Sequence, residues 1–129
     1  MIKLVDLLYE TVTRAQLKSL EQYADKLFAV VGLDIEFTTH FFDRVNDPRN
    51  LKPISDAELM DMFQKTYQKY GKKLAEFSPE AEAVLVDMQK DINIPFVIHY
   101  NRNTQQLELI TKTIMRKKNY MTSNKKLPV

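Results

Sequence analysis

Apolar side chains recur at helical spacing in two long stretches of the chain, and each stretch begins with a capping sequence. The first predicts a helix over about 14–31, because Thr13 and Gln16 form a capping box at its start and Gly32 follows its last apolar position. The second predicts a helix near 56–76, which Ser55 and Glu58 open in the same way. Residues 2–10 are also expected to form a short helix ahead of the first.

The remaining patterns indicate short strands and one more helical segment. Apolar and polar residues alternate over 35–38, which suits a brief strand, and Thr39 is placed to cap a short helix after it. The apolar run 83–88 predicts a strand, and the two β-rich runs 95–101 and 107–115 predict a hairpin. Pro95 would occupy the first position of its strand, where a missing N–H is tolerated.

The order of these elements, helices first and strands afterwards, predicts an α+β fold. We expect N-terminal helices packed on one face of a three- to four-stranded antiparallel sheet. A chain of 129 residues without repeats or a linker-like segment suggests one domain. Within it we distinguish an N-terminal helical segment over 1–33, a core over 34–118 and a basic tail over 119–129. The tail has turn-like composition, so we expect it to be ordered only by packing onto the rest.

Charge singles out the C-terminal end of the chain. Residues 111–129 carry six lysine or arginine side chains and no acid, whereas residues 1–110 carry 13 basic and 17 acidic side chains, a net charge of −4. A basic end of this kind attracts polyanions, although it is also what a solvated tail looks like.

Composition also excludes some kinds of protein. The chain has no cysteine, which excludes a disulfide framework and a cysteine-bound zinc ion. No apolar stretch approaches the length of about 20 residues that spans a bilayer, and the first residues lack the pattern of a signal peptide. We therefore expect a cytoplasmic protein without a membrane partner.

The main candidate for chemistry is the pair His40 and Arg44, which lie four residues apart and therefore on one face of a helix. A histidine exchanges a proton near neutral pH, and an arginine holds a phosphate in a bidentate fork. Arg49 follows in a proline-broken loop and adds a second guanidinium group. The alternative is structural: His40 caps or packs its short helix, and Arg44 pairs with Asp43 or Asp47.

Further candidates lie on the predicted hairpin and after it. His99 would add a second proton-transfer group on the sheet, or else be a half-exposed strand residue. The residues after the last strand combine cations with one aromatic ring, which suits either contact with RNA or a soluble sheet edge. They are Lys112, Arg116, Lys117, Lys118 and Tyr120.

Other reaction classes fit the residues poorly. The two glycines, Gly32 and Gly71, do not form a phosphate-binding loop, and the two histidines have no carboxylate at metal-ligand spacing. We therefore expect neither a metal nor another cofactor. Metal-free acid–base chemistry remains, and RNA cleavage suits it because the RNA supplies the nucleophile, its own 2′-hydroxyl group.

Four segments together resemble a pattern of small RelE-like and RegB-like endoribonucleases, which belong to the barnase, EndoU, colicin and RelE assembly of metal-independent ribonucleases. These segments are 37–44, Arg49, 53–59 at the start of a helix, and 110–114 as the closing strand. The resemblance covers about 36–116 in layout. The chain departs from the pattern at Asn50, where a glycine is usual, and in a longer loop that contains Pro48 and Pro53.

The resemblance implies metal-independent cleavage of RNA, or RNA binding, with RNA or ribosome-bound mRNA as the partner. His40 would be the acid–base residue, and Arg44 and Arg116 would complete the catalytic group. The other nucleic-acid contacts would be Arg49, Lys112, Lys117, Lys118, Tyr120 and His99.

Residues 112–118 and 122–124 are also similar to segments of uncharacterised proteins of tailed bacteriophages, which implies the cytoplasm of an infected bacterial host. Two hypotheses stay open from the sequence. One is a metal-independent endoribonuclease or RNA-binding protein, and the other is a non-catalytic phage accessory or interaction module on the same fold. The first hypothesis requires His40, Arg44 and residues 112–116 to meet on one exposed concave surface.

Overall fold

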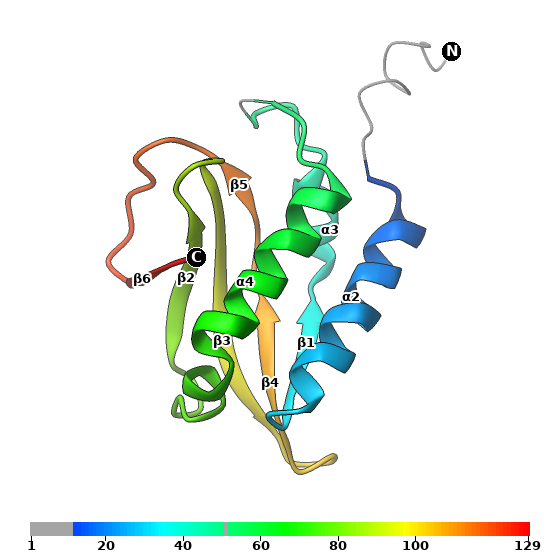
Figure 1. Cartoon of the computed structure of the whole chain (residues 1–129), viewed down its shortest axis with the longest axis vertical. Coiled ribbons are helices and arrows are strands. Elements are labelled where there is room, and N and C mark those ends of the chain that lie inside the picture. Colours follow the sequence, from blue (N-terminus) through cyan, green and yellow to red (C-terminus); the bar gives the residue numbers. More distant parts are fainter. Residues whose placement is uncertain (1–11, 51) are drawn as a thin grey trace.

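The computed structural model describes residues 12–50 and 52–129, and it has two layers: helices that cover one face of a mixed β-sheet (Figure 1). The expected helix over 2–10 lies outside the described residues. In chain order the elements are α2 (Arg14–Ala29), β1 (Leu33–Phe37), α3 (Thr39–Val45), α4 (Asp56–Ala75), β2 (Glu82–Asp87), β3 (Ile92–Asn101), β4 (Gln106–Thr111), β5 (Met115–Arg116) and β6 (Lys125–Pro128). The α+β class is therefore confirmed.

The sheet is larger than expected and is mixed rather than antiparallel. Its six strands follow the order β1-β4-β3-β2-β6, and β5 pairs with one end of β3. Strands β2, β3 and β4 form the expected antiparallel unit, but β1 pairs with β4 in parallel and β6 pairs with β2 in parallel. These two short strands satisfy the outer backbone groups of β4 and β2, which the hydrophobic pattern alone does not reveal.

The two long helices form where the capping sequences predict them. Thr13 and Gln16 make a complete capping box at the start of α2, and Ser55 and Glu58 make another at the start of α4. Gly32, which follows α2, has a φ of +76°, a left-handed conformation that glycine adopts without strain. Both helices bury their apolar stripe against the sheet, together with Ile92, Ile94, Phe96 and Ile98 of β3.

The predicted strand 107–115 is interrupted, and Pro95 explains where. Pro95 lies in the interior of β3, not at its first position, and it pairs with Val84 of β2. Its carbonyl oxygen accepts the N–H of Lys112 at 2.8 Å, but a proline has no N–H to return. The ladder with β4 ends at Thr111, and pairing resumes only at Met115 in β5. The break places Thr113 and Ile114 in the wall of a cavity beside α3.

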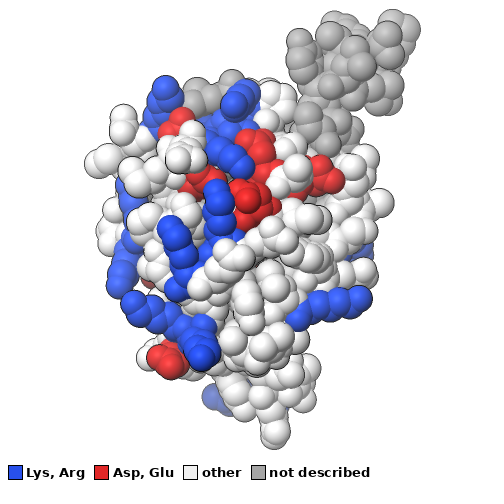
Figure 2. All heavy atoms as spheres, in the orientation of Figure 1, with Lys and Arg blue, Asp and Glu red and all other residues white. Residues whose placement is uncertain are grey.

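Charge is divided along the exposed side of α4, on the helix-covered face of the molecule (Figure 2). The first turn is acidic, with Asp56 and Glu58, and the last turn is basic, with Lys72 and Lys73. Both choices stabilise the helix, because its amino end carries partial positive charge and its carboxyl end partial negative charge.

The buried side chain of Arg116 joins residues 52–58 and the β2–β3 turn to β5, although these three parts of the chain lie far apart in the sequence. It is 2% exposed, and its guanidinium group donates to the carbonyl oxygens of Lys52 (3.1 Å), Lys90 (2.7 Å) and Pro53 (2.9 Å). It also donates to the carboxylate of Glu58 at 2.7 Å. One side chain therefore fixes the loop before α4, the first turn of α4 and the β2–β3 turn against β5.

We predict that Arg116→Ala lowers the free energy of unfolding by about 3–5 kcal/mol, because it leaves a partly buried carboxylate and three carbonyl groups without their donor. Urea unfolding followed by circular dichroism measures this change. Lys118→Ala is the control, since it removes an exposed cation nearby and should change stability by less than about 0.5 kcal/mol. Equal effects of the two substitutions would contradict the structural role of Arg116.

The ion pair with Arg116 should also make stability depend on pH. Burial acts to raise the pKa of Glu58, but hydrogen bonds from Arg116 and from Ser55 outweigh it, so this pKa lies below its ordinary value of 4.5. The stabilisation is present above that value and is lost as the pH falls through the lowered pKa of the folded state. Glu58→Gln should therefore destabilise the protein at neutral pH and cost progressively less toward about pH 3. Thermal unfolding of both proteins across this range tests the expectation, and a difference that stays constant with pH would refute it.

Candidate functional site

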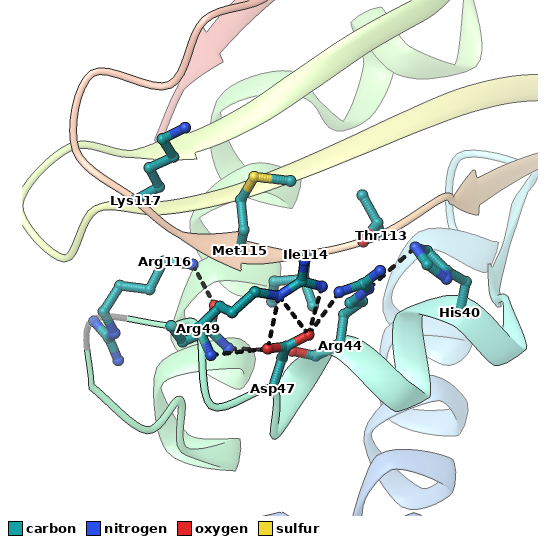
Figure 3. Close-up of a pocket in the computed structure, with 10 residues that line it drawn as sticks. His40, Arg44, Asp47, Arg49, Thr113, Ile114, Met115, Arg116 and Lys117 are labelled. Atoms are coloured by element: carbon teal, nitrogen blue, oxygen red, sulfur yellow. Dashed lines mark hydrogen bonds and ion pairs between the residues drawn. The ribbon is translucent and has the colours of Figure 1, made fainter.

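A cavity of about 550 Å³ lies between α3, the loop that follows it and residues 113–117 (Figure 3). Five of the residues singled out in the sequence for their charge or proton-transfer chemistry line it: His40, Arg44, Arg49, Arg116 and Lys117. The cavity is completed by Asp47, Asn50, Thr113, Ile114 and Met115. The pair His40 and Arg44 therefore meets the segment 113–117 on one concave surface.

The N-terminal end of α3 is attached to the end of β4. Thr38, not Thr39, is the capping residue: its hydroxyl oxygen accepts the N–H of Phe41 at 3.1 Å. The same hydroxyl group lies 2.9 Å from the carbonyl oxygen of Thr111 and 3.1 Å from that of Lys112, to which it donates. The capping residue thus fixes His40, two residues later, relative to the sheet.

The C-terminal end of α3 is attached to β5 through Asn50. Its side-chain amide donates to the carbonyl oxygens of Arg44 (3.1 Å) and Val45 (3.2 Å) in the last turn of the helix. Its side-chain oxygen accepts the N–H of Arg116 at 2.9 Å. With both ends held, α3 presents His40 and Arg44 to the cavity in a fixed orientation. The sequence comparison treated Asn50 only as a departure from a family pattern and missed this role.

His40 and Arg44 contact each other directly. The Nε–H of Arg44 donates to Nε2 of His40 at 3.3 Å, which requires a neutral imidazole ring with its proton on Nδ1. His40 is exposed, so a ligand in the cavity can reach the ring. Once Arg44 turns to another acceptor, Nε2 becomes free to take a proton.

Asp47 lies between the two arginines of the cavity. Its carboxylate accepts from Arg44 at 2.6 Å and from the Arg49 guanidinium at 2.9 Å and 3.1 Å, and it also accepts the backbone N–H of Arg49. The Arg44–Asp47 ion pair weighed as a structural alternative is therefore present, whereas Asp43 pairs with Arg14. The carboxylate is only 16% exposed, while the side chain of Arg49 is 73% exposed and able to move.

Two of the cations that the sequence suggested as RNA contacts, Arg116 and Lys112, are bound to other groups of the protein. The guanidinium group of Arg116 turns away from the cavity (Figure 3), and its four hydrogen bonds leave it unavailable to a phosphate, so the expected catalytic role of Arg116 needs correction. Lys112 forms an ion pair with Glu82 of β2 and does not line the cavity. The sequence correctly placed Lys112 and Arg116 at the end of the predicted hairpin, but no pattern in it indicated their partners Glu82 and Glu58.

The other predicted contacts lie outside this cavity. His99 is exposed on β3, and its Nδ1 is 3.5 Å from the carboxylate of Glu80. Lys118 lines a neighbouring cavity with Lys52 and Lys90, and Tyr120 is half-buried in the segment between β5 and β6. The structure thus brings together His40, Arg44, Arg49 and Lys117, and separates them from His99.

The cavity carries net positive charge. Arg44, Arg49 and Lys117 face the single carboxylate of Asp47, since the charge of Arg116 is matched by Glu58. Among residues 12–50 and 52–129, no group of three or more histidine, cysteine, aspartate or glutamate side chains is arranged to hold a metal ion. The three cations outnumber the one carboxylate, so the cavity favours an anionic ligand, and its arginine side chains suit a phosphate or carboxylate group.

Within the described part of the chain, no helix is both long and apolar enough to cross a membrane. Comparisons with family models, curated proteins and solved structures found no match. The likeness to RelE-like and RegB-like ribonucleases therefore stays a prediction from the sequence.

We predict that Thr38→Val destabilises the protein by about 1–2 kcal/mol, because valine keeps the shape of threonine but removes the cap of α3 and its bond to β4. Thr39→Val is the matched control, because Thr39 is the next residue, it is exposed, and the cap of α3 is made by the hydroxyl group of Thr38 instead. It should change stability by less than about 0.5 kcal/mol. Urea unfolding distinguishes the two, and a larger effect at Thr39 would contradict the described attachment.

Proposed function

We propose that this protein binds RNA in the cavity beside α3 and cleaves its backbone without a metal ion. The observation that carries the proposal is the meeting of His40, Arg44, Arg49 and Lys117 in one open cavity. These groups supply one proton acceptor and three cations, which is what cleavage by the substrate's own 2′-hydroxyl requires.

In the proposed reaction a phosphodiester draws Arg44 away from His40 and so frees Nε2. His40 then takes the proton of the 2′-hydroxyl group, and the 2′-oxygen forms a bond to phosphorus. The bond from phosphorus to the 5′-oxygen breaks, and that oxygen takes a proton from solvent. The products are a 2′,3′-cyclic phosphate and a 5′-hydroxyl end, and no oxidant or metal is consumed.

The cations differ in how easily they can reach the phosphate. Arg49 is mostly exposed, and Asp47 is its side-chain partner among the described residues, so it can exchange the carboxylate for a phosphate at low cost. Arg44 is more buried and already aligned with His40, which suits it to stabilise charge next to the proton transfer. Lys117 is exposed at the other wall of the cavity.

The likeness to RelE-like and RegB-like enzymes supports the same reaction, and the likeness to phage proteins supports its setting. We propose that the substrate is RNA or ribosome-bound mRNA in the cytoplasm of an infected bacterial host. A non-catalytic phage interaction module is the second candidate, and one observation favours it. Asp47 already occupies both arginines, as expected where an ion-pair network serves structure rather than a ligand.

The proposal predicts metal-independent cleavage that depends on His40. RNAs of varied sequence, free and ribosome-bound, are incubated with the protein in EDTA, and new 2′,3′-cyclic ends are quantified. His40→Ala should slow cleavage by at least about 100-fold, because it removes the proton acceptor. His99→Ala removes the other exposed histidine, which lies on β3 outside the cavity, and should leave the rate unchanged.

The outcomes separate the two candidates. Cleavage that survives in His40→Ala would exclude the assigned role of His40. RNA binding without any cleavage by the wild-type protein would favour the non-catalytic module, and the absence of both would reject the RNA hypothesis as a whole.

A further inference from the structure

A second cavity, of about 340 Å³, lies where the last turn of α4 meets the tail strand β6. We call it the tail groove and define it by Tyr70, Lys73, Phe77, Lys125 and Lys126, with Glu76 as its one acid. None of these residues was singled out in the sequence for binding, because α4 and β6 are about 50 residues apart in the chain.

The fold creates the groove by pairing β6 with β2. Lys125 lies opposite Ala83 in this ladder, and two residues later Leu127 is buried on the same side. The hydroxyl group of Tyr70 donates to the carbonyl oxygen of Pro128, which holds the end of the tail against α4. Lys125 therefore lies on the helix-covered side of β6 and Lys126 on its other side, and both border the groove.

The lysines of the groove form no ion pair with the described residues, a property that they share with other exposed lysines such as Lys18 and Lys26. Within the described residues, no carboxylate lies within ion-pair distance of Lys73, Lys125 or Lys126, nor of Lys69, one turn earlier on α4. By contrast, Lys65 and Lys90 share Asp61. Basic side chains gather over this end of α4 on the surface view (Figure 2). An anion at the groove therefore has no internal carboxylate to displace.

Aromatic rings add a second kind of contact. Tyr70 and Phe77 are half-buried in the wall of the groove, and Phe77 packs on Phe96 of β3 with ring centroids 6.4 Å apart. Rings held in place next to ammonium groups suit a ligand with alternating bases and phosphates, because every base has a face that stacks. We propose that the tail groove binds single-stranded RNA, with its lysines on the phosphates and its two aromatic side chains against a base.

This site is separate from the cavity beside α3 and goes beyond the proposed cleavage. The α3 cavity adjoins the first turn of α4 through Arg116 and Glu58, whereas the groove begins at Tyr70. Twelve residues of helix rise about 18 Å, so the two sites cannot share one phosphate. An RNA long enough to reach both would bind more tightly than either site binds alone.

The test uses a fluorescein-labelled oligouridine of about 12 nucleotides and measures its binding by anisotropy between about 0.05 and 0.2 M salt. Lys125→Gln/Lys126→Gln should weaken binding about tenfold and reduce the salt slope by about 1.4, the value for two contacts on a single strand. Lys18→Gln/Lys26→Gln is the matched control, because it removes from α2 two exposed lysines that form no ion pair with the described residues. It should leave affinity and slope nearly unchanged.

A loss in the tail variant no larger than in the control would overturn the groove proposal. Polyglutamate of equal charge that binds as tightly as oligouridine would also overturn it, since the aromatic side chains would then add nothing. Ultraviolet crosslinking of the unmodified protein gives a readout independent of folding, and adducts on the peptides that contain Tyr70 or Phe77 are expected. Adducts confined to other peptides would contradict the proposal.

The design separates this proposal from that of cleavage. Arg44→Gln/Arg49→Gln tests the α3 cavity in the same titration. If cleavage requires His40 but Lys125→Gln/Lys126→Gln binds RNA as the control does, the proposed cleavage stands and the groove proposal is rejected. A weakened tail variant of a protein that cleaves no RNA would support the groove and reject the cleavage.

Discussion

The buried guanidinium group of Arg116 is the interaction on which the rest of the structure depends. A cation that is 2% exposed is tolerated only because four acceptors surround it, and those acceptors come from three separate segments. Asp87 positions one of these acceptors, the carbonyl oxygen of Lys90. The carboxylate of Asp87 accepts the N–H groups of Gln89 and Lys90 and so fixes the conformation of the β2–β3 turn. The loop before α4 cannot shift without unpairing a buried charge.

The same constraint positions the cavity beside α3. Arg116 fixes β5, the backbone N–H of Arg116 holds Asn50, and Asn50 holds the last carbonyls of α3. At the other end of α3, Thr38 holds the end of β4. A structural arginine and two polar side chains therefore define where His40 and Arg44 stand. Arg116, which the sequence suggested as a catalytic residue, instead holds together the segments that form the wall of the cavity.

Local signals in the sequence were sufficient for the helices and for the pair on α3, and insufficient for long-range partners. Capping boxes at Thr13 and Ser55 act within four residues, so both helix starts followed from the sequence. The spacing of His40 and Arg44 likewise fixed their common face. Whether the side chain of Arg116 points into a cavity or into the protein depends on partners 26 to 64 positions away in the sequence, which no local pattern encodes. Parallel pairing of β6 with β2 is of the same kind, because a short strand of lysine, leucine and proline has no distinctive periodicity.

Acidic side chains gather at the β1 edge of the sheet, and basic side chains at the β6 edge. At the β1 edge, Glu21 and Asp25 accept the N–H groups of Phe37 and Ile35, which closes this edge to further strands. Burial and neighbouring carboxylates raise the pKa of Asp34 and of Glu36 on the same strand, which reflects how closely the acids gather there. The acids along β1 disfavour a polyanion at this edge, whereas the opposite edge of the sheet, at β6, carries the lysines of the tail groove. The two proposed binding surfaces differ in one respect. In the cavity beside α3, Asp47 competes with a phosphate for Arg44 and Arg49, whereas the lysines of the tail groove form no ion pair with the described residues. The two proposals are compatible for this reason. Binding of an RNA in the groove would offset the free-energy cost of displacing Asp47 from the arginines in the cavity beside α3, where the proposed cleavage occurs.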